Sequence, residues 1–555
     1  MKCSLEDCPF IIKAYAIRNT SLVKIREFND SHQHKVGDIC ALHKPPFSSK
    51  LVGGLILGKI RSTSNYRPNE VRKDIERDTG IQINYAQAWS AVECAKSYIH
   101  GDPKDHYKML DWICDRVKKS NPGSVAFVVV EDCKFSQLFI SFASCMQGFL
   151  FGCRPCIFVD AGHLSGPFGG TMLSACTVDA DNRILPLAIG IVSCENYDNW
   201  HWFLKQLKLI IRSLEVVVLS DRHPGIISSV AEIFGEENHC FCLRHLKENF
   251  NSELMKLGIT RRVMKENSSD LFDAIAYANT DVDFNMCMAN LEAFNTKLAE
   301  WVKNTKPEHW ARSKFPKPRW TWMNSNIAES FNSWMRNERG FSIPSLLLAY
   351  FDKLATKMLN VKNEICRWQT PIGPSIEKIL YCNYMKRSCV MRSIRYSHLM
   401  FKVEIMAAQL TVDLNKRTCS CGEWQVTGIP CAHVCYVLDQ LKYSLYDYTD
   451  SFYKKEAQEL IYQNSINPVE THELPSLEPT TGMLIIKDGD DYEGSNLCIL
   501  PPIVKKTPGR PKTRRIESQF QDMSSVHCSR CGEAKHNRRT CRSQVICNRD
   551  ELPDA

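Results

Sequence analysis

Short runs of β-branched and aromatic residues, interrupted once by a segment with helical periodicity, constrain the fold of this chain more than any other feature. Runs of this length, bounded by turn residues such as Asp181-Asn182, are typical of buried strands. The strand-like runs are 125–131, 155–161, 170–180 and 184–193, followed by a helical segment at 199–214 and a further strand at 215–221. This order of strands, helix and strand predicts an α/β domain with a mixed sheet.

The rest of the chain is either helical or irregular. Residues 60–124 and 346–400 have helical patterns, and 465–525 are rich in Pro, Gly, Asp and Ser, which predicts a flexible linker. The start, MKCSLEDCPF, lacks the apolar segment of a secretory signal, and the longest uncharged stretch, 138–153, is too short to span a bilayer. We therefore expect no membrane anchor, and we expect the 26 cysteines to be zinc ligands or free thiols.

The positive charge of the chain is concentrated near its C-terminus. The formal net charge is +8, and residues 504–546 contain eleven Lys or Arg and three Asp or Glu, so the remainder is neutral. A basic tail of this kind is typical of contact with nucleic acid. Within it, TPGRPKTRR at 507–515 resembles an AT-hook, which would lie in an A·T-rich minor groove of DNA. Its basic residues are Arg510, Lys512, Arg514 and Arg515.

A zinc-knuckle spacing, Cys-x2-Cys-x4-His-x4-Cys, lies in the same tail. Three thiolates and one imidazole fill a tetrahedral site with no open position, so such a site is structural. The basic residues around it suit single-stranded nucleic acid, and RNA binding through this tail is one interpretation of the chain. The expected Zn²⁺ ligands are Cys528, Cys531, His536 and Cys541.

A second Cys/His group has the sequence CSCGEWQVTGIPCAH. Each of its two pairs offers two ligands from adjacent backbone, and a turn with Gly428 and Pro430 brings the pairs together. The pattern resembles the SWIM zinc finger, whose motif is CxC, a spacer and CxH, and the strand before it and the apolar helix after it suit that family. The expected structural Zn²⁺ ligands are Cys419, Cys421, Cys431 and His433.

The N-terminus offers a third set of ligands: Cys3, Cys8, His32 and His34. Two Cys and two His could close a tetrahedral site, and exposed loop residues that bind no metal are the alternative. The spacing is similar to that of the zinc finger shared by WRKY-type and MuDR-type DNA-binding domains. In that family several strands precede the first cysteine, whereas Met1 lies two residues before it here, so a complete finger and a truncated one both remain open.

Two carboxylates stand at the ends of strand-like runs, Asp160 in CIFVDAGHL and Asp221 in VVVLSDRHPG. In open α/β sheets, ligands bind at the carboxyl ends of the strands. A third acid, Glu329 in MNSNIAESFNSW, lies at a helix start. Carboxylates are the ligands that Mg²⁺ or Mn²⁺ prefers, and two ions held by three of them would stabilise an in-line phosphoryl displacement. On spacing alone, solvated turns at strand ends remain the alternative.

The sequence around these acids resembles the MULE domain of plant Mutator-like, MuDR-type transposases. The resemblance covers the segment that begins VDAGHLSGPFGG, then SDRHPGIISSV, HCFCLRHLKENF and SNIAESFN, and the SWIM and knuckle motifs follow in the family's order. It implies an RNase H-like catalytic core with a DDE triad made of Asp160, Asp221 and Glu329. Cys242 and His245 match the family's Cys-x-x-His after the second Asp, although such a pair taken alone is usually part of a core.

One departure from the family is DAGHL, where Asp-Gly-Thr is common, so Ala161 and Gly162 alter the backbone beside the first metal ligand. The expected fold class is α/β, an RNase H-like core with a helical insertion, flanked by small zinc-binding modules. The boundaries that the resemblance implies are an N-terminal finger at 1–45, a core at 125–345 with an insertion at about 250–325, a SWIM finger at 405–440 and a zinc knuckle at 526–543.

Two functions from different classes follow. The first is an active transposase, which hydrolyses and rejoins DNA at element ends and needs Mg²⁺ or Mn²⁺. The second is a domesticated, transposase-derived DNA-binding transcriptional regulator without transposition, as in the far-red-impaired-response and MUSTANG-type families. In both interpretations the partner is DNA, the location is the nucleus and Zn²⁺ is structural. Neither involves a membrane or a small-molecule substrate, and a homo-oligomer is left open.

Overall fold

The structure is a computed structural model of the 555-residue chain. The chain divides into two units, Met1–Pro502 and Ile503–Ala555. The second unit contains no described residue, so the AT-hook-like segment and the zinc knuckle lie outside the description. The residues that the structure does not describe are 1–2, 4–7, 17–22, 34–47, 63–65, 67, 80, 101–103, 167, 260, 407, 473–474, 478–483, 486–498 and 503–555.

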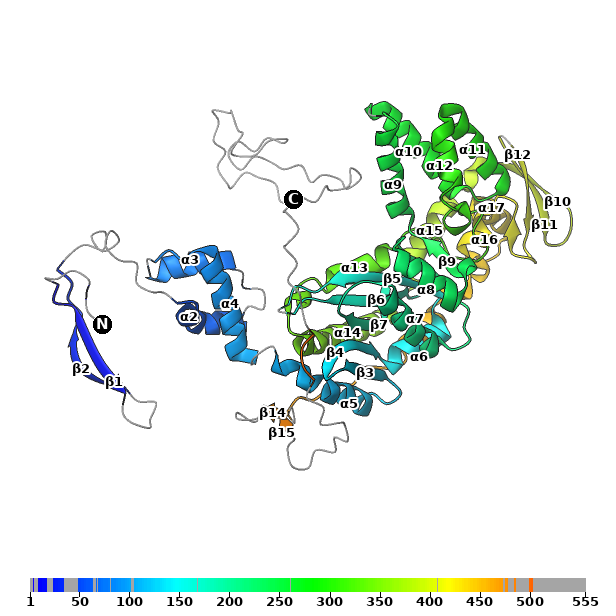
Figure 1. The fold of residues 1–555 in the computed structure, drawn as a ribbon. Helices are drawn as coiled ribbons and strands as arrows, with labels where there is room; N and C mark the ends of the chain where they lie inside the picture. Colours follow the sequence, from blue (N-terminus) through cyan, green and yellow to red (C-terminus); the bar gives the residue numbers. More distant parts are fainter. Residues whose placement is uncertain are drawn as a thin grey trace. The chain divides into compact units, whose positions relative to one another are not determined.

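A seven-stranded mixed sheet forms the centre of the first unit (Figure 1). Its order is β3-β4-β7-β6-β5-β8-β9, with antiparallel neighbours from β3 to β5 and parallel pairing of β5, β8 and β9. All residues of β6 are buried, as expected for a strand covered on both faces. The predicted mixed α/β sheet is confirmed. The strands are β3 (Val125–Glu131), β4 (Lys134–Ser141), β5 (Cys156–His163), β6 (Thr171–Val178), β7 (Ile184–Val192), β8 (Val217–Ser220) and β9 (His239–Phe241).

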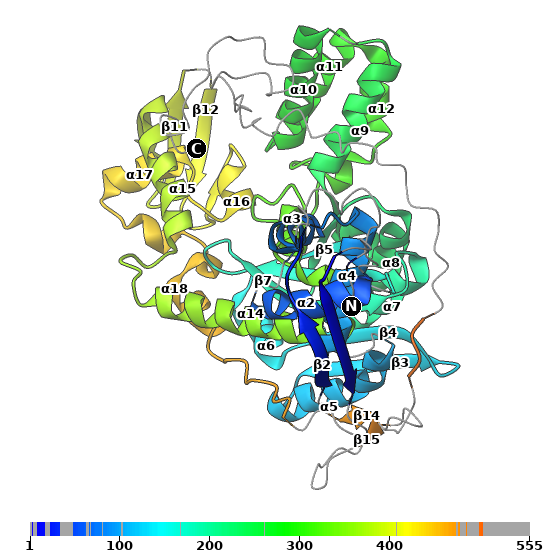
Figure 2. The same ribbon diagram turned by 90° about the vertical axis from the view of Figure 1, so that its left-hand side faces the viewer.

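Helices cover both faces of this sheet. A side chain at Gly190 of β7 would meet Phe203 of α7, and a side chain at Gly162 of β5 would meet Asn332 of α13. The antiparallel register places the two glycines one residue apart along the paired strands, so they face opposite sides of the sheet. Helices α7 and α13 therefore cover different faces. The helices around the sheet are α5 (Leu110–Ser120), α6 (Ala143–Gly152), α7 (Tyr197–Ile211), α8 (Pro224–Phe234), α13 (Asn326–Trp334), α14 (Ile343–Ile365) and α18 (Lys455–Ile461), and Figure 2 shows α18 beside α6 and α14.

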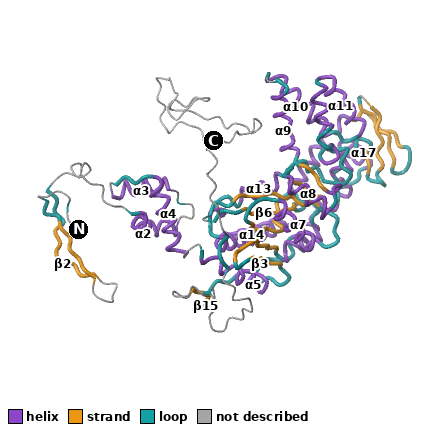
Figure 3. The backbone as a smooth tube through the Cα atoms, viewed as in Figure 1, coloured by secondary structure: helices purple, strands orange, loops and turns teal. Residues whose placement is uncertain are grey.

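Four helices between β9 and α13 pack around a hydrophobic cluster of their own, and Figure 3 shows them as a purple group. Side chains cap two of them: Thr280 accepts from the Asp283 N–H, and Asn295 accepts from the Leu298 N–H. This group occupies the stretch where the sequence predicts an insertion. The four helices are α9 (Leu243–Lys256), α10 (Arg262–Tyr277), α11 (Asp281–Phe294) and α12 (Thr296–Lys303), and the short 3-10 helix η3 (Pro307–His309) follows them.

A separate four-stranded antiparallel sheet, in the order β10-β11-β12-β13, follows α15 and packs with α17 around a third hydrophobic cluster. Its edge strand β10 leaves most of its residues exposed, whereas the sheet's inner residues, such as Val403 and Val412, are fully buried. The elements are α15 (Pro374–Met385), β10 (Val390–Arg395), β11 (Met400–Ile405), β12 (Ala408–Asp413), β13 (Thr418–Cys419), α16 (Glu423–Thr427) and α17 (Ala432–Leu441).

The N-terminal residues form two small structures. An antiparallel hairpin consists of β1 (Ile11–Ala16) and β2 (Val23–Asn29), and a three-helix group has its own hydrophobic cluster. No helix among the described residues is long and apolar enough to cross a bilayer. The remaining elements are α2 (Ser49–Ser62), α3 (Pro68–Thr79), α4 (Tyr85–His100), η1 (Asp105–Met109), η2 (Glu236–Asn238), η4 (Glu338–Gly340), η5 (Lys386–Cys389), η6 (Leu445–Tyr448), η7 (Ser451–Tyr453), β14 (Ser476–Leu477) and β15 (Leu484–Ile485).

Candidate functional site

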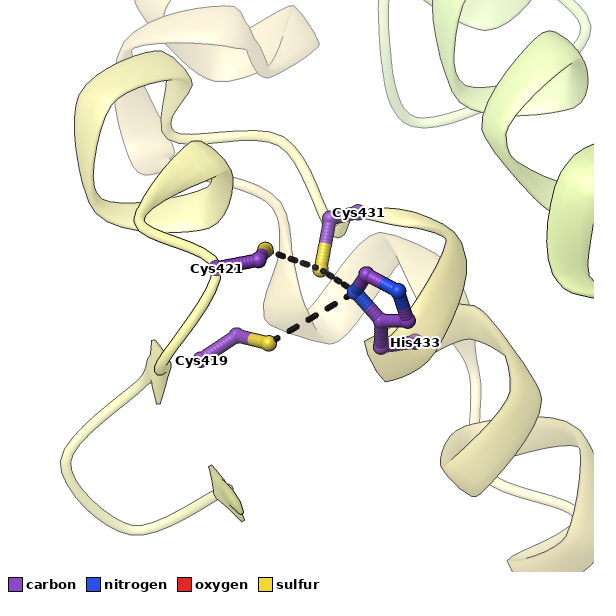
Figure 4. A group of neighbouring side chains, drawn as sticks. All are labelled: Cys419, Cys421, Cys431 and His433. Carbon is purple, nitrogen blue, oxygen red and sulfur yellow. Dashed lines mark hydrogen bonds between the residues drawn. The ribbon is translucent and has the colours of Figure 1, made fainter. Parts of the chain in front are cut away.

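Cys419, Cys421, Cys431 and His433 gather in one place (Figure 4), where one ligand atom of each lies within 4.8 Å of the others. The His433 Nδ1 is 3.8 Å from the Cys419 Sγ and 3.7 Å from the Cys431 Sγ, and the sulfurs of Cys421 and Cys431 are 3.6 Å apart. Zinc binds sulfur at about 2.3 Å and imidazole nitrogen at about 2.0–2.1 Å, so four donors at these separations can surround one tetrahedral ion. Three thiolates and an imidazole are the donor set of a structural zinc site.

Two glycines with left-handed backbone conformations shape the turn between the ligand pairs. Gly422, with φ of 76°, precedes α16, and Gly428, with φ of 71°, follows it. Residues with a Cβ are strained at these angles, so the short α16 is bounded by positions that favour glycine. Cys431 is then the N-cap residue of α17, and His433 extends from the first turn of that helix.

The thiols of this cluster interact strongly with one another. The hydrogen bond with Cys421 raises the pKa of Cys419 to about 12, whereas hydrogen bonds from Cys419 and Cys431 lower the pKa of Cys421. Cys421 is therefore the first of the group to form a thiolate. Because thiolates are the metal-binding form, a cation is what allows several of them to be held so close together.

Cys3, Cys8 and His32 form a second group of neighbouring ligand atoms. The Cys8 Sγ lies 3.4 Å from the His32 Nδ1, and the His32 ring stacks on Phe10 with 4.3 Å between ring centres. The β1–β2 hairpin explains the gathering, because Cys8 precedes β1 and His32 follows β2 at the same end of the hairpin. His34, the fourth expected ligand, lies outside the described residues.

The register of β5 and β8 brings two of the predicted carboxylates to the same end of these paired strands. The parallel strands pair Phe158 with Leu219. Asp160 lies two residues further along β5, and Asp221 lies two residues beyond Leu219, directly after β8 ends. The Asp221 carboxylate also accepts a hydrogen bond of 3.0 Å from the His223 N–H in the turn after β8.

The environment of Asp160 shows that it interacts with both of the other carboxylates. Burial is the largest cause that raises the pKa of Asp160 to about 6, and the negative charges of Asp221 and Glu329 raise it further. Hydrogen bonds from the Asn332 side chain and the Ala161 backbone act in the opposite direction. Carboxylates that repel one another in this way fit a hard divalent cation, which relieves the repulsion and takes oxygen ligands.

Glu329 reaches this edge of the sheet from the first turn of α13, after the chain has passed through α9–α12. Its carboxylate forms an ion pair with Arg244 of α9, and the His245 Nε2 lies 3.8 Å from the same oxygen. The backbone N–H of Arg244 donates to the Asn324 side chain at 3.0 Å, so the start of α9 is bound to the segment that precedes α13. Two positively charged groups therefore lie beside the third acid.

Cys242 and His245 interact at the start of α9, and each shifts the pKa of the other. Burial raises the pKa of Cys242, but the hydrogen bond and charge of His245 outweigh it, and the pKa is lowered overall. The hydrogen bond with Cys242 raises the pKa of His245 to about 9. The Ser325 N–H also donates to the Cys242 sulfur at 3.3 Å, so the pair joins the start of α9 to the start of α13.

Two residues that the sequence analysis did not single out contact the carboxylates. The Asn332 side chain donates to Asp160 at 2.8 Å, and Arg244 pairs with Glu329. Asn332 lies three residues after Glu329 in one helix, and this spacing, which puts both on one helical face, could have identified it. Arg244 has no sequence signal of its own beyond its position between Cys242 and His245.

The other predicted site residues cannot be placed, because they lie outside the described residues. They are the knuckle ligands Cys528, Cys531, His536 and Cys541 and the AT-hook-like residues Arg510, Lys512, Arg514 and Arg515.

Two family models match parts of the chain. The MULE transposase domain matches residues 156–249, and the SWIM zinc finger matches residues 401–442. The first match includes Asp160 and Asp221 and ends before Glu329, and the second includes all four residues of the cysteine–histidine cluster. No match to a curated protein was found. The predicted resemblance to these two families is confirmed, so the chain is transposase-like and has a zinc-binding module.

Proposed function

We propose that this chain is a MuDR-type Mutator-like transposase that cuts and rejoins DNA strands with a DDE triad. The observation that supports this most directly is the electrostatic interaction of Asp160, in β5, with Asp221, directly after β8, and with Glu329. A buried carboxylate whose pKa is raised by burial and by two neighbouring carboxylates is typical of a functional site. The MULE match over two of the three is the second support.

The residues would divide the work as follows. Asp160 and Asp221, held by the sheet, and Glu329, held by α13, would bind Mg²⁺ or Mn²⁺. When bound, such ions stabilise the attacking and leaving oxygens of a phosphoryl displacement. Arg244 and His245 place positive charge beside Glu329, which suits the phosphate of a DNA strand.

The core that carries these residues is proposed to be RNase H-like. In support, β7, β6 and β5 are antiparallel, α7 follows them, and β8 and β9 then pair in parallel on the other side of β5. This connection brings β5 and β8 together, which are the first and the fourth strand of the segment from β5 to β9. Asp221 directly follows β8, whereas Asp160 lies within β5, which continues to His163, so the expectation that Asp160 ends its strand is wrong.

The proposal also includes DNA as the partner, the nucleus as the location and a plant source. Structural Zn²⁺ would occupy the SWIM cluster, the N-terminal group and the knuckle. The resemblance of the sequence motifs to the family supports these points, and the geometry of the first two groups adds to it.

The second candidate function is a domesticated DNA-binding regulator without strand cleavage. One specific observation favours it: Glu329 already has an ion-pair partner in Arg244, which could hold the acid in place without any divalent cation. A retained carboxylate would then have a structural role.

The test compares the full-length protein with Asp221→Asn, which keeps the shape of the side chain and removes its charge. The control is Asp352→Asn, at an exposed position of α14. Cleavage of a duplex that carries the sequences flanking the gene is measured with Mn²⁺. We expect Asp221→Asn to lower cleavage by at least about a hundredfold, the cost of losing one group that stabilises transition-state charge, and the control to be unchanged.

Zinc content and DNA affinity should be equal in all three proteins, because the carboxylates act on the transition state rather than on duplex binding. If the wild-type protein binds DNA but neither binds Mn²⁺ nor cuts, the transposase proposal is wrong and the regulator is the better assignment.

A further inference from the structure

The contact between Asn332 and Asp160 joins α13 to β5 at the centre of the carboxylate site. The Asn332 Nδ2 donates to the Asp160 Oδ2 at 2.8 Å, and Asn332 is only 8% exposed. The other amide atom, Oδ1, is also buried and has no hydrogen-bond partner among the described residues. The amide therefore directs its polar interaction to Asp160, and it leaves a buried oxygen unsatisfied in order to do so.

Gly162 provides the space that this contact needs. A Cβ at Gly162 would lie 2.7 Å from the Asn332 Oδ1 and 2.9 Å from the Arg339 Nη1, closer than side-chain atoms approach one another. The backbone of Gly162 does not require a glycine conformation, because its φ is not positive. A side chain at Gly162 would therefore displace the Asn332 amide or the Arg339 guanidinium, and Asp160 and Gly162 lie on the same face of the strand.

We infer that Asn332, seated on Gly162, is a positioning residue that fixes the orientation of the Asp160 carboxylate. A carboxylate on a strand can rotate about its side-chain bonds, and the Asn332 amide holds one oxygen so that the other stays directed to the edge of the sheet. Metal-binding carboxylates are commonly held by such second contacts, whose loss weakens metal affinity by about 10–100-fold. This inference rests on the proposed function of the same site.

In the DAGHL sequence, Gly162 is the position against which Asn332 packs. The glycine and the asparagine therefore act as one unit, although they are 170 residues apart in the chain.

The experiment titrates Mn²⁺ into the full chain in the presence of linear plasmid DNA and follows free Mn²⁺ by electron paramagnetic resonance. Asn332→Leu has nearly the shape of asparagine and removes the donor, and Gly162→Ala pushes the amide away without changing Asn332 itself. We expect each variant to raise the Mn²⁺ dissociation constant by about 10–100-fold. The double variant should be little weaker than either single one, since both remove the same contact.

The matched control is Ser330→Ala, at an exposed position on the same helix. It should bind Mn²⁺ as the wild type does, and all variants should keep the wild-type zinc content. If Asn332→Leu lowers the melting temperature so far that it is not folded, Asn332→Ser removes the same contact with a smaller polar residue.

Wild-type binding of Mn²⁺ together with unchanged binding in Asn332→Leu and Gly162→Ala would overturn the inference and leave the proposed function standing. Absence of Mn²⁺ binding in the wild type would overturn both. Additive losses in the double variant would show that the two residues act separately, which also contradicts the inference.

Discussion

The cysteine–histidine cluster and the carboxylate site are assembled over very different lengths of chain. The four residues of the cluster come from a single segment, 419–433, in which two glycine turns bring the ligands together. The three carboxylates come from β5, the residue after β8 and α13, and Asp221 and Glu329 interact with Asp160 only because two strands pair in parallel and four helices return the chain to the sheet. A local site can be identified from spacing, whereas an assembled site depends on topology.

The two sites also differ in what supports them. The cluster belongs to a small module, but its ligand loop is bound to the rest of the protein: the Tyr453 hydroxyl donates to the Thr427 carbonyl at 2.7 Å, and the Asn383 side chain donates to the Pro430 carbonyl at 3.1 Å. The carboxylate site has no such short loop and depends on the whole sheet. Changes to one site should therefore leave the other largely intact.

The largest expected effect is that of Cys431→Ser on the cluster. It removes one of four ligands, and the protein should lose one zinc ion per chain and much of the metal-derived folding energy, which is on the order of 10 kcal/mol in isolated zinc fingers. The contacts of the ligand loop should limit unfolding to the module. Metal analysis of chelator-washed protein measures the zinc, and Mn²⁺ titration should show an unchanged carboxylate site.

Cys435→Ser is the matched control for this change. Cys435 is a buried thiol on the same helix that is not part of the cluster, and its sulfur contacts the Pro430 carbonyl at 3.5 Å. It should keep the full zinc content and lose about 1 kcal/mol of unfolding free energy at most. Equal zinc in Cys431→Ser and Cys435→Ser would mean that the cluster does not bind zinc.

The same contrast explains what the sequence could predict. The strand runs, the mixed sheet and the CxC and CxH pairs all follow from residues that are close in sequence, and the structure and the family models agree with them. Asp160 and Asp221 could be proposed from the strand-like runs that lead to them and Glu329 from its place at a helix start, but only the family resemblance joined the three in one triad. Asn332 and Arg244 were missed, because their partners are 172 and 85 residues away, and only the spacing of Asn332 from Glu329 within α13 pointed to one of them.

Asp179 is a buried carboxylate that stabilises the sheet and is not part of the candidate site, so it can be compared with the three acids. It follows β6, at the opposite end of the strands from the three acids, and is fully buried. One oxygen accepts from the N–H groups of Asp181 and Arg183 at 3.0 and 2.8 Å. The other accepts from Gln458 of α18 at 2.7 Å and from Tyr462 at 3.1 Å, so one side chain joins the turn after β6 to the C-terminal helix.

Asp179→Ala should lower the free energy of unfolding by about 3–5 kcal/mol, because it leaves several buried donors without an acceptor. Zinc content should not change, since none of these contacts reaches the cluster ligands. Urea denaturation followed by tryptophan fluorescence measures the effect. Asp352→Ala, at an exposed position of α14, is the control and should stay within about 0.5 kcal/mol of wild type; equal midpoints for the two variants would contradict the structural role of Asp179.

His239 gives the sheet, and not the cluster, a specific dependence on pH. It lies in β9 beside β8, where its Nε2 is 2.8 Å from the Ser220 hydroxyl. Burial is the main cause that lowers the pKa of His239 to about 3, and the neighbouring His309 lowers it further, while Glu236 opposes the shift. The imidazole therefore stays neutral in the folded protein at pH values where it is protonated in the unfolded chain.

The sign of the pH effect follows from this difference. Above pH 6.5, the ordinary pKa of histidine, His239 is neutral in both the folded and the unfolded protein, and its contribution to stability is complete. Between pH 6.5 and about 3, only the unfolded chain takes up the proton, so the free energy of unfolding falls as the pH falls. The slope from one group is at most about 1.4 kcal/mol per pH unit.

The variant His239→Asn tests this, because Asn keeps a polar group near Ser220 without the titration. It should flatten the dependence of the free energy of unfolding on pH between pH 7 and pH 5. Zinc ligands also release metal on acidification, but they do so equally in both proteins, so the difference between the two urea-denaturation series isolates His239. Parallel pH curves for wild type and His239→Asn would show that His239 takes up its proton in the folded sheet as readily as in the unfolded chain.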